Sequence, residues 1–287
     1  MSPATGANFQ WRCPSCHEPL NHADKQWRCD NNHCFDSAKE GYVNLLLAQH
    51  KKSQEPGDSK AMINARRDFL GAGFYAPLAT RIAELLVEHS TDSKHSVQGA
   101  FNLADAGCGE GYYLRTIVEY LNQQGMSVCA TGIDISKPAV QKAAKRTAEH
   151  HYAVASCFDI PLRNESQHAV IQVFAPSSEE EINRILTHNG LWIQVNPAAE
   201  HLFELKQFVY DSPQKHTIDT DIPKGFALVT HTDLKFPIAL TSPSQRLSLL
   251  MMTPFYWQLS EDKKATLLEK LAATHAHFDI RVLSALR

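Results

Sequence analysis

The sequence contains neither an apolar run of transmembrane length nor a secretory signal. A membrane-spanning helix needs about 20 consecutive apolar residues, and no segment approaches that length. The first residues, MSPATGANFQWRC, have no basic start followed by an apolar core, which a signal peptide requires. The cysteines number seven, and an odd count without a signal peptide argues against a disulfide framework. These absences predict a cytoplasmic protein with no membrane partner.

The sequence also has no overall excess of basic charge. Its 287 residues carry a formal net charge of −3, and 43% of them are apolar, which suits one sizeable core and a small satellite domain. Between residues 49 and 67, however, basic side chains outnumber acidic ones: Lys51, Lys52, Lys60, Arg66 and Arg67, against Glu55 and Asp58. This local excess is compatible with contact to a polyanion and also with an ordinary solvated surface.

Four cysteines lie close together near the N-terminus in an arrangement typical of a zinc site. Cys13 and Cys16 are two residues apart, and Cys29 precedes the pair His33 and Cys34. Each cluster sits on a short turn, so two ligands from each turn can reach one ion, and zinc favours thiolate and imidazole. The first three cysteines are predicted ligands, and the fourth ligand is either His33 or Cys34. Four protein ligands leave no open position, so the zinc is expected to be structural.

From residue 100 onward, apolar strand patterns alternate with helical ones. Five buried strands are predicted, over residues 101–106, 127–135, 152–155, 169–174 and 191–195. Helices are predicted over residues 62–70, 78–86, 113–121, 137–150 and 179–186. This alternation indicates a doubly wound, mostly parallel sheet. Alternating segments at 226–236 and 277–283 fit two further strands that close the sheet antiparallel, which makes seven.

The turn from Asp105 to Gly111 is the most informative stretch. It follows an apolar strand, opens a helix and has a glycine at every second position from 107, and such glycines let a backbone approach a ligand closely. The lysine and hydroxyl residue of a phosphate-binding P-loop are missing. Asp134, at the end of the next strand, can accept hydrogen bonds from both hydroxyls of a ribose. Asp105 suits an amino group better than a pyrophosphate, so a nucleoside with an amino-acid tail is expected.

These residues resemble the first motif of the class I methyltransferases, hydrophobic-Asp-x-Gly-x-Gly-x-Gly. The resemblance implies S-adenosylmethionine as cofactor, with its methionine part held by Asp105, Gly107, Gly109 and Gly111, and Glu110 and Tyr112 are further expected cofactor-binding residues. It also assigns the ribose to Asp134. That family often has an acidic residue after the third strand, which contacts the adenine amino group. The matching position here is Ser156, and Asp159 is a weaker candidate that also suits a helix or turn cap.

Further motifs occur outside the cofactor turn: Lys39-Glu-Gly-Tyr-Val-Asn-Leu-Leu46, Gln49-His-Lys51, Pro56-Gly-Asp-Ser59, Ala65-Arg-Arg67 and Met252-Thr-Pro-Phe255. Over nearly its whole length, the chain therefore resembles the bacterial 23S rRNA guanine-N1 methyltransferases that act in the hairpin 35 region. The resemblance implies 23S rRNA rather than DNA as the partner. It also favours His33 as the fourth zinc ligand, because that family uses three cysteines and one histidine.

Guanine N1 lies on the Watson–Crick edge, so an enzyme can reach it only when the base is unpaired or flipped out. Four aromatic residues could stack on such a base or belong to the core instead: Tyr112, Tyr113, Phe174 and Phe255. The N1 proton must also leave, and no base is identified. Asp58 is considered for this role, with a structural role in its loop as the alternative.

Phosphate contacts are expected from the basic side chains of the connector: Lys51, Lys52, Arg66 and Arg67. The competing expectation is that the two arginines pair with acidic residues on a helix surface. Three segments are predicted, namely a zinc module over 1–36, a basic connector with helices over 37–90 and a Rossmann-like catalytic domain over 91–287. A homodimer is possible.

Two other functions use parts of this pattern. The same core serves many small-molecule methyltransferases, although such an enzyme would need neither a zinc module nor a basic connector. A non-catalytic, zinc-containing RNA-binding or assembly protein is the second alternative. It would have no need for cofactor-binding acids at Asp105 and Asp134.

Overall fold

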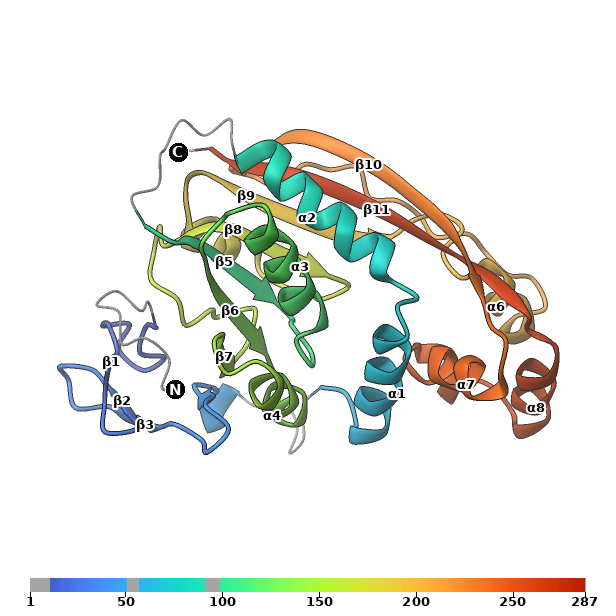
Figure 1. Cartoon of the computed structure of the whole chain (residues 1–287), viewed down its shortest axis with the longest axis horizontal. Helices are drawn as coiled ribbons and strands as arrows, with labels where there is room; N and C mark the ends of the chain where they lie inside the picture. Colours follow the sequence, from blue (N-terminus) through green and yellow to red (C-terminus); the bar gives the residue numbers. More distant parts are fainter. Residues whose placement is uncertain (1–10, 51–56, 91–98, 287) are drawn as a thin grey trace.

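The computed structural model describes residues 11–50, 57–90 and 99–286. Its centre is an eight-stranded sheet of order β10-β11-β9-β8-β5-β6-β7-β4 (Figure 1). The parallel part contains the five strands predicted from buried apolar runs: β5 (Phe101–Ala106), β6 (Val128–Asp134), β7 (His151–Val154), β8 (Gln167–Val173) and β9 (Leu186–Pro197). Two long strands complete it, β10 (Phe226–Ala239) and β11 (Ala273–Ala285). β11 pairs antiparallel with both β9 and β10, which confirms the expected closure of the sheet.

The eighth strand comes from a segment that the sequence analysis placed in the connector. β4 (Val43–Asn44) pairs in parallel with β7, and the amide of Leu45 donates to the carbonyl of Val154 over 2.9 Å. Tyr42 and Leu46 pack into one core, whereas Val43 and Leu45 pack into the other, because side chains alternate between the two faces of a sheet. The motif around residues 39–46 thus forms one edge of the catalytic sheet.

Eight α-helices lie among the described residues: α1 (Lys60–Gly71), α2 (Ala76–Ser90), α3 (Tyr112–Gln123), α4 (Lys137–Arg146), α5 (Glu179–Ile185), α6 (Phe203–Val209), α7 (Pro243–Met251) and α8 (Glu261–Lys270). Two 3-10 turns, η1 (Ala48–His50) and η2 (Pro254–Trp257), accompany them. α4 ends at Arg146 rather than at the predicted residue 150, because the chain extends at Thr147 and soon enters β7. α6 was not predicted, since its seven residues show too little periodicity.

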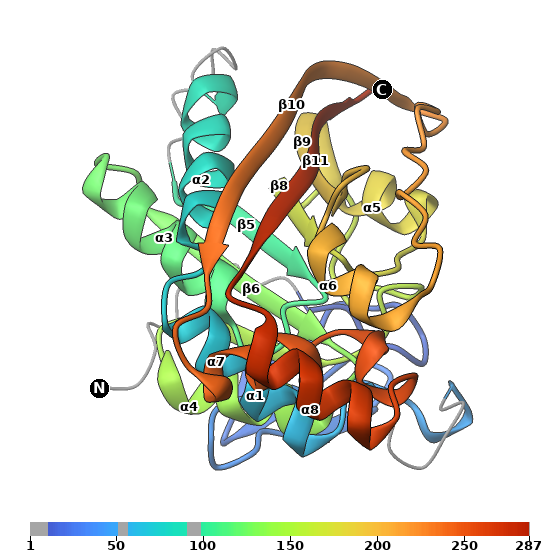
Figure 2. The same cartoon turned by 90° about the vertical axis from the view of Figure 1, so that its right-hand side faces the viewer.

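The helices cover the sheet from both sides. In Figure 2, α2 and α3 lie on one side of the sheet and α5 on the other. Alternate residues of each central strand feed two cores, so that Leu103 belongs to one and Ala104 to the other. Both views show α1 beside α7, near the end of the β10–β11 ribbon. No helix in the described ranges is long and apolar enough to cross a bilayer.

The N-terminal module has a small antiparallel sheet of three strands: β1 (Asn21–Ala23), β2 (Gln26–Arg28) and β3 (Cys34–Asp36). Its Trp11 side chain is fully buried and belongs to the same core as strands β5 to β7. Arg12 adds an ion pair with Asp159 over 3.3 Å. The module therefore packs directly on the catalytic sheet and closes part of one of its faces.

Candidate active site and metal centre

The cofactor turn opens onto a cavity of about 980 Å³. Six of the eight predicted cofactor-binding residues line it: Gly107, Gly109, Glu110, Tyr112, Asp134 and Ser156. They follow the carboxyl ends of β5, β6 and β7, which is where doubly wound sheets bind their ligands. The other two, Asp105 and Gly111, are not among the lining residues.

The three glycines of the turn all have positive φ, but they differ in how much space surrounds them. A Cβ on Gly109 would meet no atom within 4 Å, so this position faces open space that a ligand can occupy. A Cβ on Gly107 would lie 2.2 Å from Cβ of Ala175, and one on Gly111 would lie 2.9 Å from the hydroxyl of Tyr152. Gly107 and Gly111 are therefore required by packing and backbone conformation, whereas the space beside Gly109 is open.

The carboxylate of Asp134 is oriented by two backbone amides. Its Oδ2 accepts a hydrogen bond from the amide of Gly109 over 2.9 Å, and Oδ1 accepts one from Ser136 over 2.7 Å. Burial raises the pKa of this carboxyl, and the two amides act in the opposite direction. A carboxylate oxygen can accept more than one hydrogen bond, so each oxygen can still bind a ribose hydroxyl.

Asp105 is the most deeply buried acid near the turn, with 1% of its surface exposed. Its Oδ2 has no hydrogen-bond partner among the described residues. Burial, and secondarily the charge of Asp134, raises the pKa of Asp105 to about 8. A buried carboxyl with an unused oxygen is costly, and an ammonium group would remove that cost. The site thus fits a ligand that carries an amino group.

Glu110 is a second buried acid, with 3% of its surface exposed and Oε1 unpartnered within the described part of the chain. Its Oε2 lies 3.4 Å from Nη1 of Arg146. Burial raises the pKa of this carboxyl, although Arg115 and Arg146 act against the shift. Arg115 also lies over the ring of Tyr112, 5.9 Å from its centre. The acid thus has both an unused acceptor and nearby cations.

The part of the cavity that is lined by the glycine turn and Asp134 is called the cofactor half from here on. Its far end is formed by the segment after β7. Ser156 lines the cavity, and its hydroxyl accepts a hydrogen bond from the amide of Phe158 over 3.1 Å. Asp159, the other candidate for adenine, does not line this cavity and pairs instead with Arg12 of the zinc module. Asp159 thus has a structural contact, but as an ion-pair partner of the zinc module rather than as the helix or turn cap that the sequence suggested.

The described part of the Pro56–Ser59 motif, residues 57–59, leads into α1 beside the cofactor turn. A Cβ on Gly57 would lie 2.8 Å from Cβ of Ser136, so the loop packs closely against the residues after β6. Asp58 and Arg66 both line the cavity and form an ion pair with each other. That pairing agrees with the structural role considered for Asp58, because its carboxylate already has a partner in Arg66.

Arg67 pairs with Asp68 over 3.0 Å. Both arginines of the connector thus make the pairing with acids that competes with phosphate contact. Lys51 and Lys52 lie outside the described residues. Phosphate contact by these four side chains stays a prediction.

The rest of the cavity is formed by chain segments far from the turn. Phe174, which follows β8, is 42% exposed and has φ +54°, a conformation that is strained for a residue with a side chain and that is common at functional sites. Tyr112 is buried, and Tyr113 and Phe255 are partly buried against the core. Phe174 is thus the most accessible of the four aromatic candidates.

Further lining residues come from segments 197–217 and 252–255, among them His201, Lys206, Tyr210 and His216. Sequence reasoning missed these side chains. No local motif marks them, and their segment, which follows β9, is held in place by β11: the amides of Ala198 and Leu202 donate to the carbonyls of His277 and His275. The motif Met252–Phe255 was recognised, and all four of its residues line the cavity.

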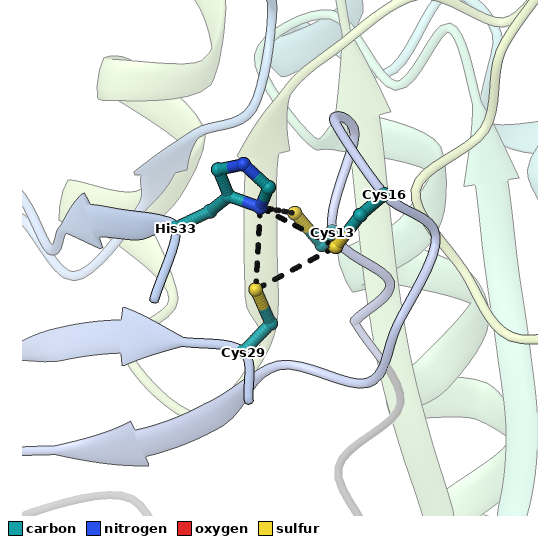
Figure 3. A group of neighbouring side chains, drawn as sticks. All are labelled: Cys13, Cys16, Cys29 and His33. Atoms are coloured by element: carbon teal, nitrogen blue, oxygen red, sulfur yellow. Dashed lines mark hydrogen bonds between the residues drawn. The ribbon is translucent and has the colours of Figure 1, made fainter. Parts of the chain in front are cut away.

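The predicted zinc ligands converge on one point (Figure 3). The ligand atoms of Cys13, Cys16, Cys29 and His33 all lie within 4.8 Å of one another. His33 Nδ1 is 3.3 to 3.6 Å from the three sulfurs, and the sulfurs of Cys16 and Cys29 are 3.6 Å apart. Two sulfurs at the usual distance from one tetrahedral zinc are about 3.7 Å apart. The donor set therefore fits a closed, structural zinc site.

Cys34 does not belong to this group. Its exposed thiol donates to Oε1 of Gln26 over 3.2 Å. A turn in which the amide of Cys29 donates to the carbonyl of His33 directs the imidazole inward, and the next side chain belongs to β3. The geometry agrees with His33 as the fourth zinc ligand, which is the choice that the family resemblance favoured.

Together, the doubly wound sheet, the glycine turn and the buried acids define a class I, S-adenosylmethionine-dependent methyltransferase. A family profile described as "Methyltransferase domain" matches residues 79–228, and one described as "RlmA, N-terminal", a zinc ribbon, matches residues 11–54. The chain belongs to the RlmA-like family of 23S rRNA (guanine-N1)-methyltransferases.

Two relatives support this assignment. A Bacillus subtilis protein described as a putative 23S rRNA (guanine-N(1)-)-methyltransferase is 31% identical over 96% of this chain and 97% of its own length. The 23S rRNA (guanine(748)-N(1))-methyltransferase of Streptomyces fradiae is 38% identical over 68% of this chain and 65% of its own.

Among solved structures, MccD protein matches 73% of this chain and 98% of its own at 18% identity, with a TM-score of 0.47.

Proposed function

We propose that this enzyme methylates N1 of a guanosine in the hairpin 35 region of 23S rRNA. One observation carries the proposal: the similarity to the Bacillus subtilis relative extends over 96% of the chain and includes the zinc ribbon. A small-molecule methyltransferase would need only the catalytic sheet. A non-catalytic RNA-binding protein would have no use for a buried acid with an unused oxygen beside a glycine that faces open space.

In this proposal the chain binds the cofactor through its own buried groups. Asp105 accepts the amino group, Gly109 leaves room for the methionine part, and Asp134 accepts hydrogen bonds from the ribose. Glu110 and Tyr112 shape the methionine end, Ser156 contacts the adenine end, and Gly107 and Gly111 fix the turn. When bound, S-adenosylmethionine supplies an electrophilic methyl group, and rigid positioning of the acceptor supplies much of the rate.

The acceptor base enters the half of the cavity that contains Phe174. A flipped-out guanine can stack on this exposed ring, which keeps the base oriented while its N1 faces the cofactor. Lys51 and Lys52 contact phosphates, and Arg66 and Arg67 join them when their pairs with Asp58 and Asp68 open. Neutralising these basic residues should weaken RNA binding and flatten its salt dependence.

The zinc ion is bound by Cys13, Cys16, Cys29 and His33, and it stabilises the N-terminal module. We keep the predicted division into residues 1–36, 37–90 and 91–287, with the first segment packed on the third. A cytoplasmic location is part of the proposal because the substrate is rRNA. The homodimer stays a prediction that analytical ultracentrifugation can test.

The direct test uses 23S rRNA from cells that lack the enzyme. Mass spectrometry of the hairpin 35 fragment should show that N1-methylguanosine is lost in these cells and restored by the wild-type gene. The variant Asp134→Ala should not restore it, whereas Cys34→Ser should. Persistence of the methylated nucleoside in the deletion strain would refute the substrate assignment. Transfer of tritium from labelled cofactor to a metabolite extract, but not to RNA, would favour the small-molecule alternative.

A further inference from the structure

The two halves of the cavity differ in charge. The cofactor half contains the carboxylates of Asp58, Glu110 and Asp134. In the other half, burial lowers the pKa of both His201 and His216, that of His201 to about 3, and nearby Lys206 acts in the same direction. The two imidazoles are therefore neutral at physiological pH, so the cationic groups of this half are lysines.

Lys206 is the unusual one of the two lysines that line this half. It lies on α6, and only 6% of its surface is exposed. Its Nζ donates one hydrogen bond, to the carbonyl oxygen of Gln214 over 3.1 Å, and it makes no ion pair within the described part of the chain. Lys215 instead is exposed and pairs with Glu200 over 2.5 Å. An ammonium group has three protons to donate, so Lys206 has donor capacity left in a shielded position.

The surroundings of Lys206 suit a planar, polar ligand. The rings of Phe174 and His201 are 5.4 Å apart, and α6 begins shortly after His201. Burial lowers the pKa of the Lys206 ammonium, because no acid compensates the loss of water. A base stacked on the exposed face of Phe174 can direct its edge toward α6, where a neutral acceptor would satisfy the ammonium.

We propose that Lys206 donates a hydrogen bond to O6 of the target guanine. Guanine has a hydrogen-bond acceptor at this position. Adenine has an amino group there, which is a donor like the ammonium of Lys206 and cannot accept a hydrogen bond from it. When the N1 proton leaves to water, the electron pair stays on the ring and is shared between N1 and O6, so a cation at O6 would stabilise it. N1 would then form its bond to the methyl carbon as the bond from that carbon to sulfur breaks, with the electron pair of the broken bond staying on the sulfur. Lys206 thus selects guanine and promotes its reaction. This inference rests on the proposed function.

The test measures binding of hairpin 35 RNA with either guanosine or 2-aminopurine at the target position. 2-Aminopurine keeps the exocyclic amine but has hydrogen in place of O6. It also lacks the N1 proton, so the comparison between protein variants is the decisive one. The wild-type enzyme should prefer guanosine by about tenfold or more, as expected for a hydrogen bond to a charged group. Lys206→Met should bind both RNAs alike, and the matched control Lys215→Met should keep the preference.

Lys206→Met should also slow methylation of the guanosine hairpin by about tenfold or more, and Lys206→Arg should restore part of the rate. The thermal midpoint of Lys206→Met should be no lower than that of the wild type, because a buried charge without a compensating acid is removed, and its cofactor affinity should be unchanged. A preference that persists in Lys206→Met would overturn the proposal. Equal weakening for both RNAs would also overturn it, because that result indicates a phosphate contact or a structural role. If the wild-type enzyme does not methylate the guanosine hairpin, the proposed function itself fails.

Discussion

Replacing Asp105 with asparagine should stabilise the free enzyme and weaken its binding of cofactor. In the folded chain, the pKa of Asp105 is raised from 3.8 to about 8, first by burial and then by Asp134. Between these two pH values, the folded state therefore retains a proton on Asp105 that the unfolded chain has already released. A group with a raised pKa contributes stability that is present below its unfolded pKa and is lost as pH rises through the folded value.

The magnitude follows from the size of this shift. Each pH unit within the window is worth about 1.4 kcal/mol for one proton. Between pH 6 and 7.5, Asp105 should therefore lower the free energy of unfolding of the wild type by about 2 kcal/mol. Asp105→Asn lacks this dependence, and its advantage over the wild type should grow across the same interval. Urea unfolding of the zinc-loaded protein at the two pH values measures it.

In cofactor binding, the ionised form of Asp105 should be favourable, whereas in the free enzyme it lowers stability. An amino group stabilises the ionised carboxyl, so the wild type should release about one proton on binding at pH 7. Affinity should rise toward tenfold per pH unit below pH 8. Calorimetry in buffers with different ionisation enthalpies measures the proton count. Asp105→Asn should release no proton and bind more weakly by about tenfold or more.

The exposed carboxyl of Asp68 provides a matched control, since it pairs with Arg67 at the surface of α1. Asp68→Asn should change neither the pH dependence of unfolding nor the proton release. The reasoning about Asp105 is refuted if Asp105→Asn binds cofactor as tightly as the wild type and unfolds with the same pH dependence. Weaker binding without any change in proton release would place the amino group elsewhere.

Three further outcomes are expected. Gly109→Val and Gly107→Val should both lower the thermal midpoint, because both positions have positive φ, but Gly107→Val should lower it more, since its side chain would also collide with Ala175; Gly109→Val should in addition weaken cofactor binding in calorimetry, and equal midpoints for the two variants would contradict the division of roles. Cys16→Ser should lose the zinc and destabilise the N-terminal module, whereas Cys34→Ser should retain about one zinc per chain by elemental analysis; zinc loss in the second variant would exclude His33 as the fourth ligand. Asp134→Ala should reduce cofactor affinity by about 1.5–3 kcal/mol, since two hydrogen bonds to a charged group disappear; unchanged affinity in calorimetry would mean that the ribose binds elsewhere.

Features that depend on neighbouring residues were determined by the sequence itself. The spacing of Cys13, Cys16 and Cys29 indicates a metal site, because each turn brings its own ligands together whatever the rest of the chain does. The glycine turn likewise indicates a nucleoside site, since the strand before it and the helix after it are local elements. The parallel order of the central strands follows from their alternation with helices.

The tertiary structure decided what depends on distant segments. Whether His33 or Cys34 completes the metal site depends on how the second turn meets the first. Gly107 is needed because the Cβ of Ala175, a residue just after β8, lies 2.2 Å from where a Cβ on Gly107 would be, and no local pattern contains that contact. The sequence did not indicate a role for Lys206 for the same reason. It is one basic residue among many, and only the fold shows that its ammonium group is buried away from water without an acid to pair with.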